Sequence, residues 1–154
     1  RSPWIIAGTM TMMGLFLWVA DRGGQKSDSV EHVGTTRAIL IGCSQAFAII
    51  PGVSRSGVTI TTGLLLGLQR TAAVQFSFFM SMPIIFGAVV LKSHYLFSSL
   101  GQPGVALAVI ASAVSGLAAI HVLMTYVKTR SFAPFVVYRL ALGLGLFAYL
   151  LARK

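Results

Sequence analysis

The stretch PGVSRSGVT, residues Pro51–Thr59, interrupts an apolar part of the sequence. Residues 38–50 before its PGVSRSG part (residues 51–57) and residues 58–68 after that part carry no charged side chain. As helices, the two arms would reach about 20 Å and 16 Å, whereas the hydrocarbon core of a bilayer is about 30 Å thick. Neither arm can therefore cross a membrane alone. We expect residues 38–68 to form a re-entrant helix-loop-helix hairpin or, alternatively, one broken helix that crosses the bilayer completely.

The composition of the chain indicates an integral membrane protein. Of its 154 residues, 56% are apolar and only 10% are charged, which the core of a soluble protein does not explain. The net charge of +9 would suggest a nucleic-acid partner in a soluble protein. Here most Lys and Arg residues flank apolar runs, as membrane topology and contact with lipid head groups require. We therefore expect membrane lipids, and no nucleic acid, as partners.

Four further runs are long and apolar enough to cross a bilayer: residues 3–20, 71–91, 104–127 and 135–152. Residues 21–37 are polar, contain all three acidic residues and predict a solvated loop. We predict a single all-α membrane domain over residues 1–154, with about four transmembrane helices and the hairpin at about 38–68. Both arrangements of the 38–68 segment leave a similar excess of Lys and Arg on one face, so these charges do not decide the orientation.

Arg55 lies within this apolar region and needs a compensating charge. A charged side chain near the bilayer centre costs about 2.5 to 3.5 kcal/mol on insertion scales. The only carboxylates are those of Asp21, Asp28 and Glu31, and all precede the motif. An anionic ligand, or a segment outside this chain, would supply the counter-charge. In the simpler alternative, Arg55 snorkels or binds carbonyl groups freed at the break, and the motif is only a kink.

The residues around Arg55 favour phosphate as the anion. Pro51 ends the first arm, and Gly52 and Gly57 let the backbone turn and approach a ligand closely. The second arm begins near Ser56, so its first amides would face the break and attract an anion. An arginine can bind two phosphate oxygens at once. Three side chains add hydroxyl donors: Ser54, Ser56 and Thr59.

With Gln45 upstream, the motif resembles that of the undecaprenyl-diphosphate phosphatases, also called the bacitracin-resistance family. The similarity continues through QFSFFMSMPIIFGA (Gln75–Ala88) and FVVYRLALG (Phe135–Gly143). It implies an all-helical fold of two inverted repeats, each with a re-entrant hairpin, that meet at a central site. This chain resembles roughly the C-terminal half to three-fifths of a family member, because it lacks the Glu-rich motif and the Ser-Ser-Thr-Gly-His stretch of the first repeat. We therefore expect further sequence upstream of Arg1.

The resemblance also implies a reaction. It is the hydrolysis of undecaprenyl diphosphate to undecaprenyl phosphate and inorganic phosphate, which recycles the lipid carrier for cell-wall synthesis. Arg55 and Ser54 would take part in catalysis. The residues expected to bind substrate are Gln45, Gly52, Ser56, Gly57 and Thr59. A divalent cation, Mg or Ca, would be held by carboxylates of the missing N-terminal repeat and by no residue of this chain.

The same resemblance implies a multi-pass protein of the bacterial inner membrane. Its site would face the periplasm, and its partners would be the isoprenyl diphosphate substrate, membrane lipids and its own N-terminal repeat. Because this chain would supply only an Arg/Ser clamp for the phosphate, we do not expect it to turn over alone.

Other functions compete with this interpretation. A transporter or lipid-carrier translocase could bind an anionic lipid at a broken helix and would need only the clamp. Paired glutamates and a histidine on a matching upstream hairpin would instead favour hydrolysis. Lipid phosphatases of the acid-phosphatase type need His near their Ser and Arg motifs, and PGVSRSG has none nearby. A purely structural membrane subunit would leave Arg55 unexplained.

Few other residues are candidates for chemistry. His32, His94 and His121 are too scattered for a metal site; we expect the first two in loops and the third on a helix. Arg139, beside Tyr138, lies near the start of the last apolar run. It could snorkel to the end of that helix, or it could face the substrate.

Overall fold

The computed structural model describes residues 2–23, 27–99 and 103–153. Within these ranges the chain forms seven α-helices, two 3-10 helices and no strand longer than a single bridge. In chain order they are α1 (Pro3–Arg22), η1 (Val30–His32), α2 (Thr35–Ser44), η2 (Gln45–Ile49), α3 (Arg55–Leu65), α4 (Arg70–Leu91), α5 (Ser93–Ser99), α6 (Val105–Thr129) and α7 (Ala133–Ala152). Four of them, α1, α4, α6 and α7, are long and apolar enough to cross a membrane. The predicted all-α fold with four membrane spans is confirmed.

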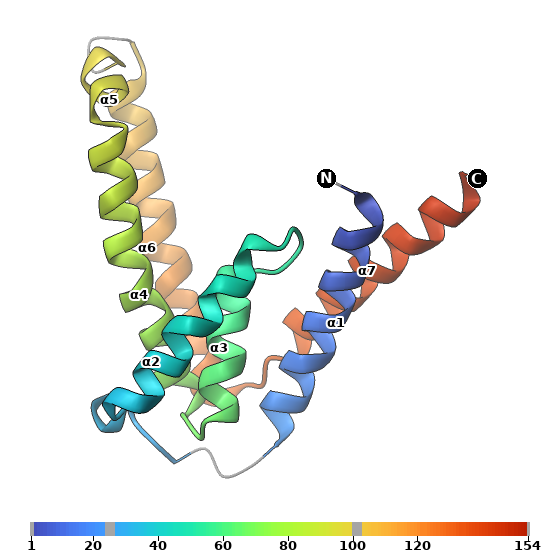
Figure 1. The fold of residues 1–154 in the computed structure, drawn as a ribbon. Helices are drawn as coiled ribbons and strands as arrows, with labels where there is room; N and C mark the ends of the chain where they lie inside the picture. Colours follow the sequence, from blue (N-terminus) through green and yellow to red (C-terminus); the bar gives the residue numbers. More distant parts are fainter. Residues whose placement is uncertain (1, 24–26, 100–102, 154) are drawn as a thin grey trace.

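Two pairs of long helices flank a central hairpin (Figure 1). Helix α1 packs against α7, and α4 lies beside α6, while α3 contacts both α1 and α4. The buried core lies mainly where α1 and α6 end and where α4 and α7 begin. Its members there include Leu17, Ala20, Leu68, Ala72, Val127, Phe132 and Val136. Away from this end, many large apolar side chains are exposed, as expected of surfaces that face lipid.

The segment predicted as two short arms is a helical hairpin. Helix α3 runs back beside α2 (Figure 1). At the open end, the Asp28 N–H donates to the Gly67 carbonyl at 3.3 Å, and the Gln69 N–H donates to the Asp28 carbonyl at 3.0 Å. The chain therefore enters and leaves the hairpin at the same end. A single broken helix would instead hold these two residues far apart.

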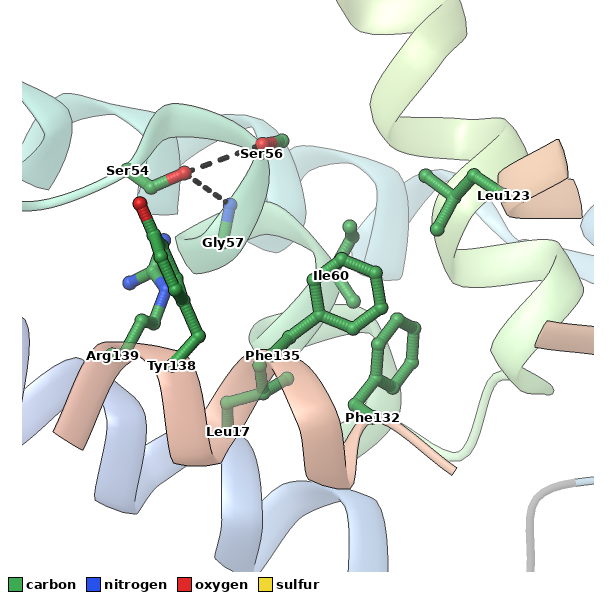
Figure 2. A pocket seen from close by; sticks show the side chains of 10 residues that line it. All are labelled: Leu17, Ser54, Ser56, Gly57, Ile60, Leu123, Phe132, Phe135, Tyr138 and Arg139. Carbon is green, nitrogen blue, oxygen red and sulfur yellow. Dashed lines mark hydrogen bonds between the residues drawn. The ribbon is translucent and has the colours of Figure 1, made fainter. Parts of the chain in front are cut away.

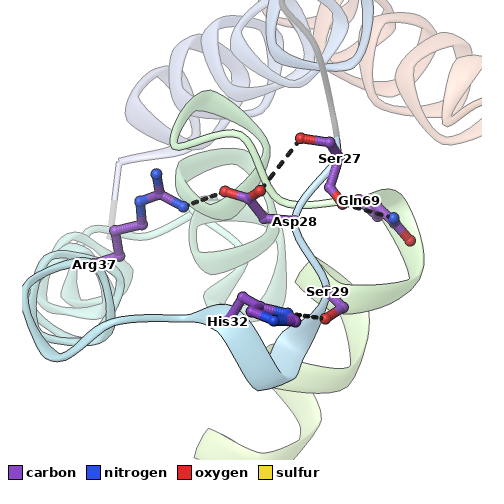
Figure 3. Close-up of polar contacts among 6 residues, drawn as sticks. All are labelled: Ser27, Asp28, Ser29, His32, Arg37 and Gln69. Carbon is purple, nitrogen blue, oxygen red and sulfur yellow. Dashed lines mark hydrogen bonds and ion pairs between the residues drawn. The ribbon is translucent and has the colours of Figure 1, made fainter.

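Side chains reinforce this open end (Figure 3). Gln69 Nε2 donates to the Ser27 carbonyl at 2.8 Å, and the Arg37 guanidinium pairs with the Asp28 carboxylate. The hydrogen bond from Arg37 lowers the pKa of Asp28 below its ordinary value of 3.8, although desolvation opposes the shift. Because the folded-state pKa is lowered, this pair stabilises the fold above the ordinary pKa, and the contribution is lost as the pH falls through the lowered pKa.

Several boundaries differ from the prediction. Helix α3 begins at Arg55, one residue before the predicted start near Ser56, and Ser54 caps it by accepting a 3.1 Å hydrogen bond from the Gly57 N–H. Helix α2 begins at Thr35, inside the segment expected to be a loop. The expected loop after α4 contains the short helix α5, which includes His94. A short apolar and aromatic stretch inside a connection gives little signal for a helix of this length.

The sequence predicted Asp21 in a solvated loop. In the structure it lies in the last turn of α1, where it is only 6% exposed. Its Oδ1 accepts a hydrogen bond from Arg70 Nε at 2.6 Å, and its Oδ2 accepts one from the Phe132 N–H at 3.0 Å. One carboxylate thus joins the end of α1 to the start of α4 and to the residue that precedes α7. The prediction was wrong because both partners lie far along the chain.

We expect Asp21→Ala to reduce the free energy of unfolding by about 1 to 3 kcal/mol, the usual cost of leaving buried hydrogen-bonding groups without a partner. Unfolding of the detergent-solubilised protein by sodium dodecyl sulfate measures this change. Glu31→Ala is the matched control, because Glu31 is exposed on η1 and its loss should have little effect. Equal stability of the two variants would contradict the role given to Asp21.

Candidate functional site

The first half of the PGVSRSGVT motif forms the turn between η2 and α3. Gly52 has a φ of 91°, a conformation that favours glycine. A Cβ at this position would lie 2.1 Å from Thr9 Oγ1 and 2.9 Å from the Ile6 carbonyl oxygen. The Thr9 hydroxyl also donates to the Pro51 carbonyl at 2.7 Å. Helix α1 therefore holds the turn in place, and only glycine fits at position 52.

Arg55 and Ser56 are the first two residues of α3, and both are exposed. With Ser77 and Ser81 of α4, they line a cavity of about 270 Å³ between the two helices. Among the residues that the structure describes, none forms an ion pair or hydrogen bond with the Arg55 guanidinium. The cavity therefore combines an unpaired cation with hydroxyl groups from two helices.

Thr59 has a different position from the other residues of the motif. It is 2% exposed, and its hydroxyl lies 2.8 Å from Ser77 Oγ. The same hydroxyl is 3.1 Å from the carbonyl oxygens of Arg55 and Ser56, so it can donate to either. Thr59 thus fastens the first turn of α3 to α4.

The remaining predicted residues lie on both sides of the break. Ser54 Oγ caps α3 and lies 3.3 Å from Ser56 Oγ. Gly57 lies in the first turn of α3, next to this cap. Gln45 is the first residue of η2 and is half-buried. The structure therefore brings Ser54, Arg55, Ser56 and Gly57 together at the amino end of α3, whereas Gln45 lies on the arm that precedes the turn.

Arg139 also reaches the amino end of α3, from α7 (Figure 2). A Cβ added to Gly57 would lie 2.8 Å from Arg139 Nη2. Arg139 and Tyr138 line a cavity of about 240 Å³ together with Ser54, Ser56 and Gly57. The sequence left two alternatives for Arg139: its side chain could snorkel to the end of the helix, or it could face the substrate. In the structure the guanidinium points toward α3, which does not agree with snorkelling.

The carboxylates of the chain lie away from these two arginines. Asp21 is paired with Arg70, and Asp28 is paired with Arg37. Glu31 is exposed on η1, which lies before the hairpin. Like Arg55, Arg139 has no ion-pair or hydrogen-bond partner within the described ranges. The amino end of α3 therefore carries two uncompensated cations beside several hydroxyl groups, an arrangement suited to an anion.

The described residues contain no group of three or more His, Cys, Asp or Glu side chains that could hold a metal ion. His32 lies in the connection before α2, as predicted, where it ends the three-residue helix η1 and its Nδ1 lies 2.8 Å from Ser29 Oγ. His121 lies on α6, as predicted. The described residues therefore offer no such cluster of ligands for the divalent cation that the family resemblance implies.

Comparison with known proteins identifies the family. Residues 1–145 match the family described as bacitracin resistance protein BacA. The chain belongs to this family. The match confirms the resemblance seen around PGVSRSGVT, and with the four apolar helices it identifies a multi-pass membrane protein of the BacA family.

Several curated relatives are similar over almost the whole chain, and each is named undecaprenyl-diphosphatase. The relative from Trichlorobacter lovleyi is 46% identical over 153 residues, which cover 97% of this chain and 56% of the relative. The relative from Gemmatimonas aurantiaca is 46% identical over 154 residues, covering 99% and 58%. The relative from Moorella thermoacetica is 48% identical over 145 residues, covering 93% and 55%. The chain thus spans little more than half the length of these relatives.

We expect Gly52→Ala to destabilise the fold by at least about 1 kcal/mol, because alanine is strained at this positive φ and its Cβ would collide with Thr9. The midpoint of thermal denaturation in detergent measures the loss. Gly42→Ala is the matched control on α2, where a Cβ meets nothing within 4 Å. This control should be neutral or slightly stabilising. A Gly52→Ala protein as stable as the control would show that α1 does not constrain the turn.

Proposed function

We propose that the complete protein hydrolyses undecaprenyl diphosphate to undecaprenyl phosphate and inorganic phosphate, and so recycles the lipid carrier used in cell-wall synthesis. The main structural support is the amino end of α3, where Arg55 is exposed beside Ser54 and Ser56 and has no partner among the described residues. Family membership and relatives named undecaprenyl-diphosphatase support the choice of substrate.

The contribution of this chain to the reaction is electrostatic. Arg55 binds oxygens of the terminal phosphate, and the first amides of α3 and nearby hydroxyls donate further hydrogen bonds. During hydrolysis, a water oxygen bonds to the terminal phosphorus as the bond from that phosphorus to the bridging oxygen breaks. The bridging oxygen leaves with the prenyl phosphate, and charge shifts within the group bound by Arg55. Preorganised donors stabilise this charge without reorganising.

Ser54 has a more restricted role than Arg55. Its Oγ accepts the hydrogen bond from the Gly57 N–H, so its lone pair serves the helix cap while its proton remains available to a phosphate oxygen. Ser54 therefore acts as a donor and keeps the first turn of α3 in position. Gln45, Gly52 and Thr59 act on the same site by supporting the arm, shaping the turn and fastening α3 to α4.

The other requirements of hydrolysis belong to the N-terminal repeat. Proton removal from water needs a base, and a divalent cation needs a set of donor ligands; the described residues around α3 supply neither. We propose that this repeat provides a Mg²⁺ or Ca²⁺ site and the base. The chain alone would then bind substrate without hydrolysing it.

The hairpin supports a proposal about where the site lies in the membrane. We infer that α2 and α3 enter the bilayer from one face, as a re-entrant element, and meet a matching hairpin of the N-terminal repeat. The tied open end formed by Asp28, Gly67 and Gln69 supports this placement. The protein would lie in the bacterial plasma membrane, with the site open to the periplasm, where the lipid diphosphate is delivered.

Arg55→Ala in the complete protein should reduce phosphate release from undecaprenyl diphosphate by at least about a hundredfold, the scale of losing one strong transition-state donor. Colorimetric detection of inorganic phosphate in detergent measures this rate. Arg130→Ala is the control, because Arg130 is an exposed cation beyond the end of α6. Near-normal turnover of Arg55→Ala would remove the clamp from the mechanism. If the unmodified protein binds the lipid but releases no phosphate, the translocase alternative is favoured.

Cysteine labelling tests the re-entrant placement. In a Cys43→Ser background, cysteines at Thr36 and Gln69 should react with membrane-impermeant maleimide from the same face of sealed vesicles. A cysteine at Lys92, at the other end of α4, should react from the opposite face. All three positions are exposed. Labelling of Thr36→Cys and Gln69→Cys from opposite faces would mean that the hairpin segment crosses the bilayer.

A further inference from the structure

The cavity beside Arg139 has one polar end and one apolar end (Figure 2). The polar end contains Arg139 and Tyr138 of α7 and the first turn of α3. The apolar end is lined by side chains from four different elements or their flanks: Leu17, Ile60, Leu123, Phe132 and Phe135. A ligand that fits both ends carries an anionic group joined directly to a hydrocarbon chain.

Arg139 requires such an anion. It lies on an apolar helix long enough to span a membrane, it is half-buried, and its guanidinium is unpaired within the described residues. Cations in such helices normally face a cavity and a partner. The two carboxylates closest to helix ends, Asp21 and Asp28, are already paired with Arg70 and Arg37. The counter-charge of Arg139 therefore comes from outside these residues, and the cavity beside its guanidinium is a place where an anionic ligand would supply it.

The hydrocarbon part of the ligand is indicated by the apolar end. Phe132 and Phe135 lie with their ring centroids 6.0 Å apart, and Ile60 and Leu123 lie nearby (Figure 2). Aromatic and branched aliphatic side chains pack well against a branched, unsaturated chain and offer it no hydrogen bond. A cavity of about 240 Å³ has room for a phosphate and the beginning of such a chain.

We propose that this cavity binds the prenyl phosphate part of the substrate, with Arg139 on the phosphate attached to the chain and the apolar end around the first isoprene units. This proposal rests on the proposed function for the identity of the lipid. Arg55 lies in the other cavity, on the α4 side of α3, and Ser56 lines both cavities. The terminal phosphate, which is released, is therefore bound by Arg55, and the phosphate that stays on the carrier is bound by Arg139.

Direct binding of farnesyl monophosphate to the complete protein in nanodiscs tests the role of Arg139. Arg139→Gln should weaken this binding at least about tenfold, as expected when a hydrogen bond to a charged group is lost. Arg139→Lys, which keeps the charge, should restore part of the affinity. Arg153→Gln is the matched control at the other, exposed end of α7 and should bind as the unmodified protein does. Unchanged binding by a folded Arg139→Gln protein would overturn the assignment.

A second variant tests the apolar end and does not depend on the folding of Arg139→Gln. Leu123→Trp should fill this end and abolish most binding of farnesyl monophosphate, while binding of inorganic phosphate is retained. Leu117→Trp, on the same helix but 69% exposed, is the control and should leave both unchanged. Normal binding of farnesyl monophosphate by Leu123→Trp would show that the chain does not lie in this cavity.

These measurements separate the two proposals. Binding of the monophosphate requires no turnover, so it tests the cavity even if the complete protein hydrolyses nothing. Conversely, phosphate release from undecaprenyl diphosphate with unchanged binding in both cavity variants would retain the proposed function and reject the position of the lipid.

Discussion

The buried carboxylate of Asp21 determines how the two helix pairs of this chain meet. It lies in α1 and accepts hydrogen bonds from Arg70, at the start of α4, and from the main chain of Phe132, just before α7. Three segments are therefore joined at one point. Loss of either donor would leave a buried carboxylate oxygen without a hydrogen bond, which would lower the free energy of unfolding. Because α3 packs between α1 and α4, the same contact fixes the surroundings of the PGVSRSGVT motif.

The pairing of Asp21 with Arg70 also affects the charge at the PGVSRSGVT motif. The chain has only three carboxylates for twelve Lys and Arg side chains. Asp21 and Asp28 each pair with an arginine at the end where the helices join, so neither can neutralise a cation at the amino end of α3. Arg55 and Arg139 consequently remain available to a ligand. The acidic side chains that stabilise the fold thus leave the positive charge at the amino end of α3 without a partner among the described residues.

The parts of the fold that depend on local sequence could be predicted. The four spans follow from length and hydropathy, and Pro51 and Gly52 mark the break between α2 and α3. The contacts of Asp21 could not be predicted, because its partners lie 49 and 111 residues away and the residues that follow it in sequence are polar. The start of α3 was predicted to within one residue, because glycines and serines at the break suggest a helix start, and the cap formed by Ser54 places it at Arg55.

The position of Arg139 shows a similar limit. Like Arg55, it is an arginine within an apolar stretch, a context that indicates a need for a compensating charge. Its closeness to the start of α7 also allowed snorkelling, and only the position of Arg139 Nη2 beside Gly57 of α3 distinguishes the two. Likewise, Thr59 resembled a cavity residue by its place in the motif, and its hydrogen bond with Ser77 depends on the register of α3 against α4. The predicted role of these residues in binding stays a prediction, whereas their positions are properties of the fold.

The two cavities beside the amino end of α3 differ in polarity. On the α4 side, Arg55 and Ser56 are exposed and their cavity contains the hydroxyls of Ser77 and Ser81. On the α7 side, Arg139 lies next to aromatic and aliphatic side chains. Water and polar catalytic groups therefore have access to the first side, and a hydrocarbon chain is better solvated on the second. In the proposed reaction, a diphosphate bound across the amino end of α3 would place the bond that breaks between these two surroundings, so that the inorganic product would form on the polar side and the lipid product would stay on the apolar side.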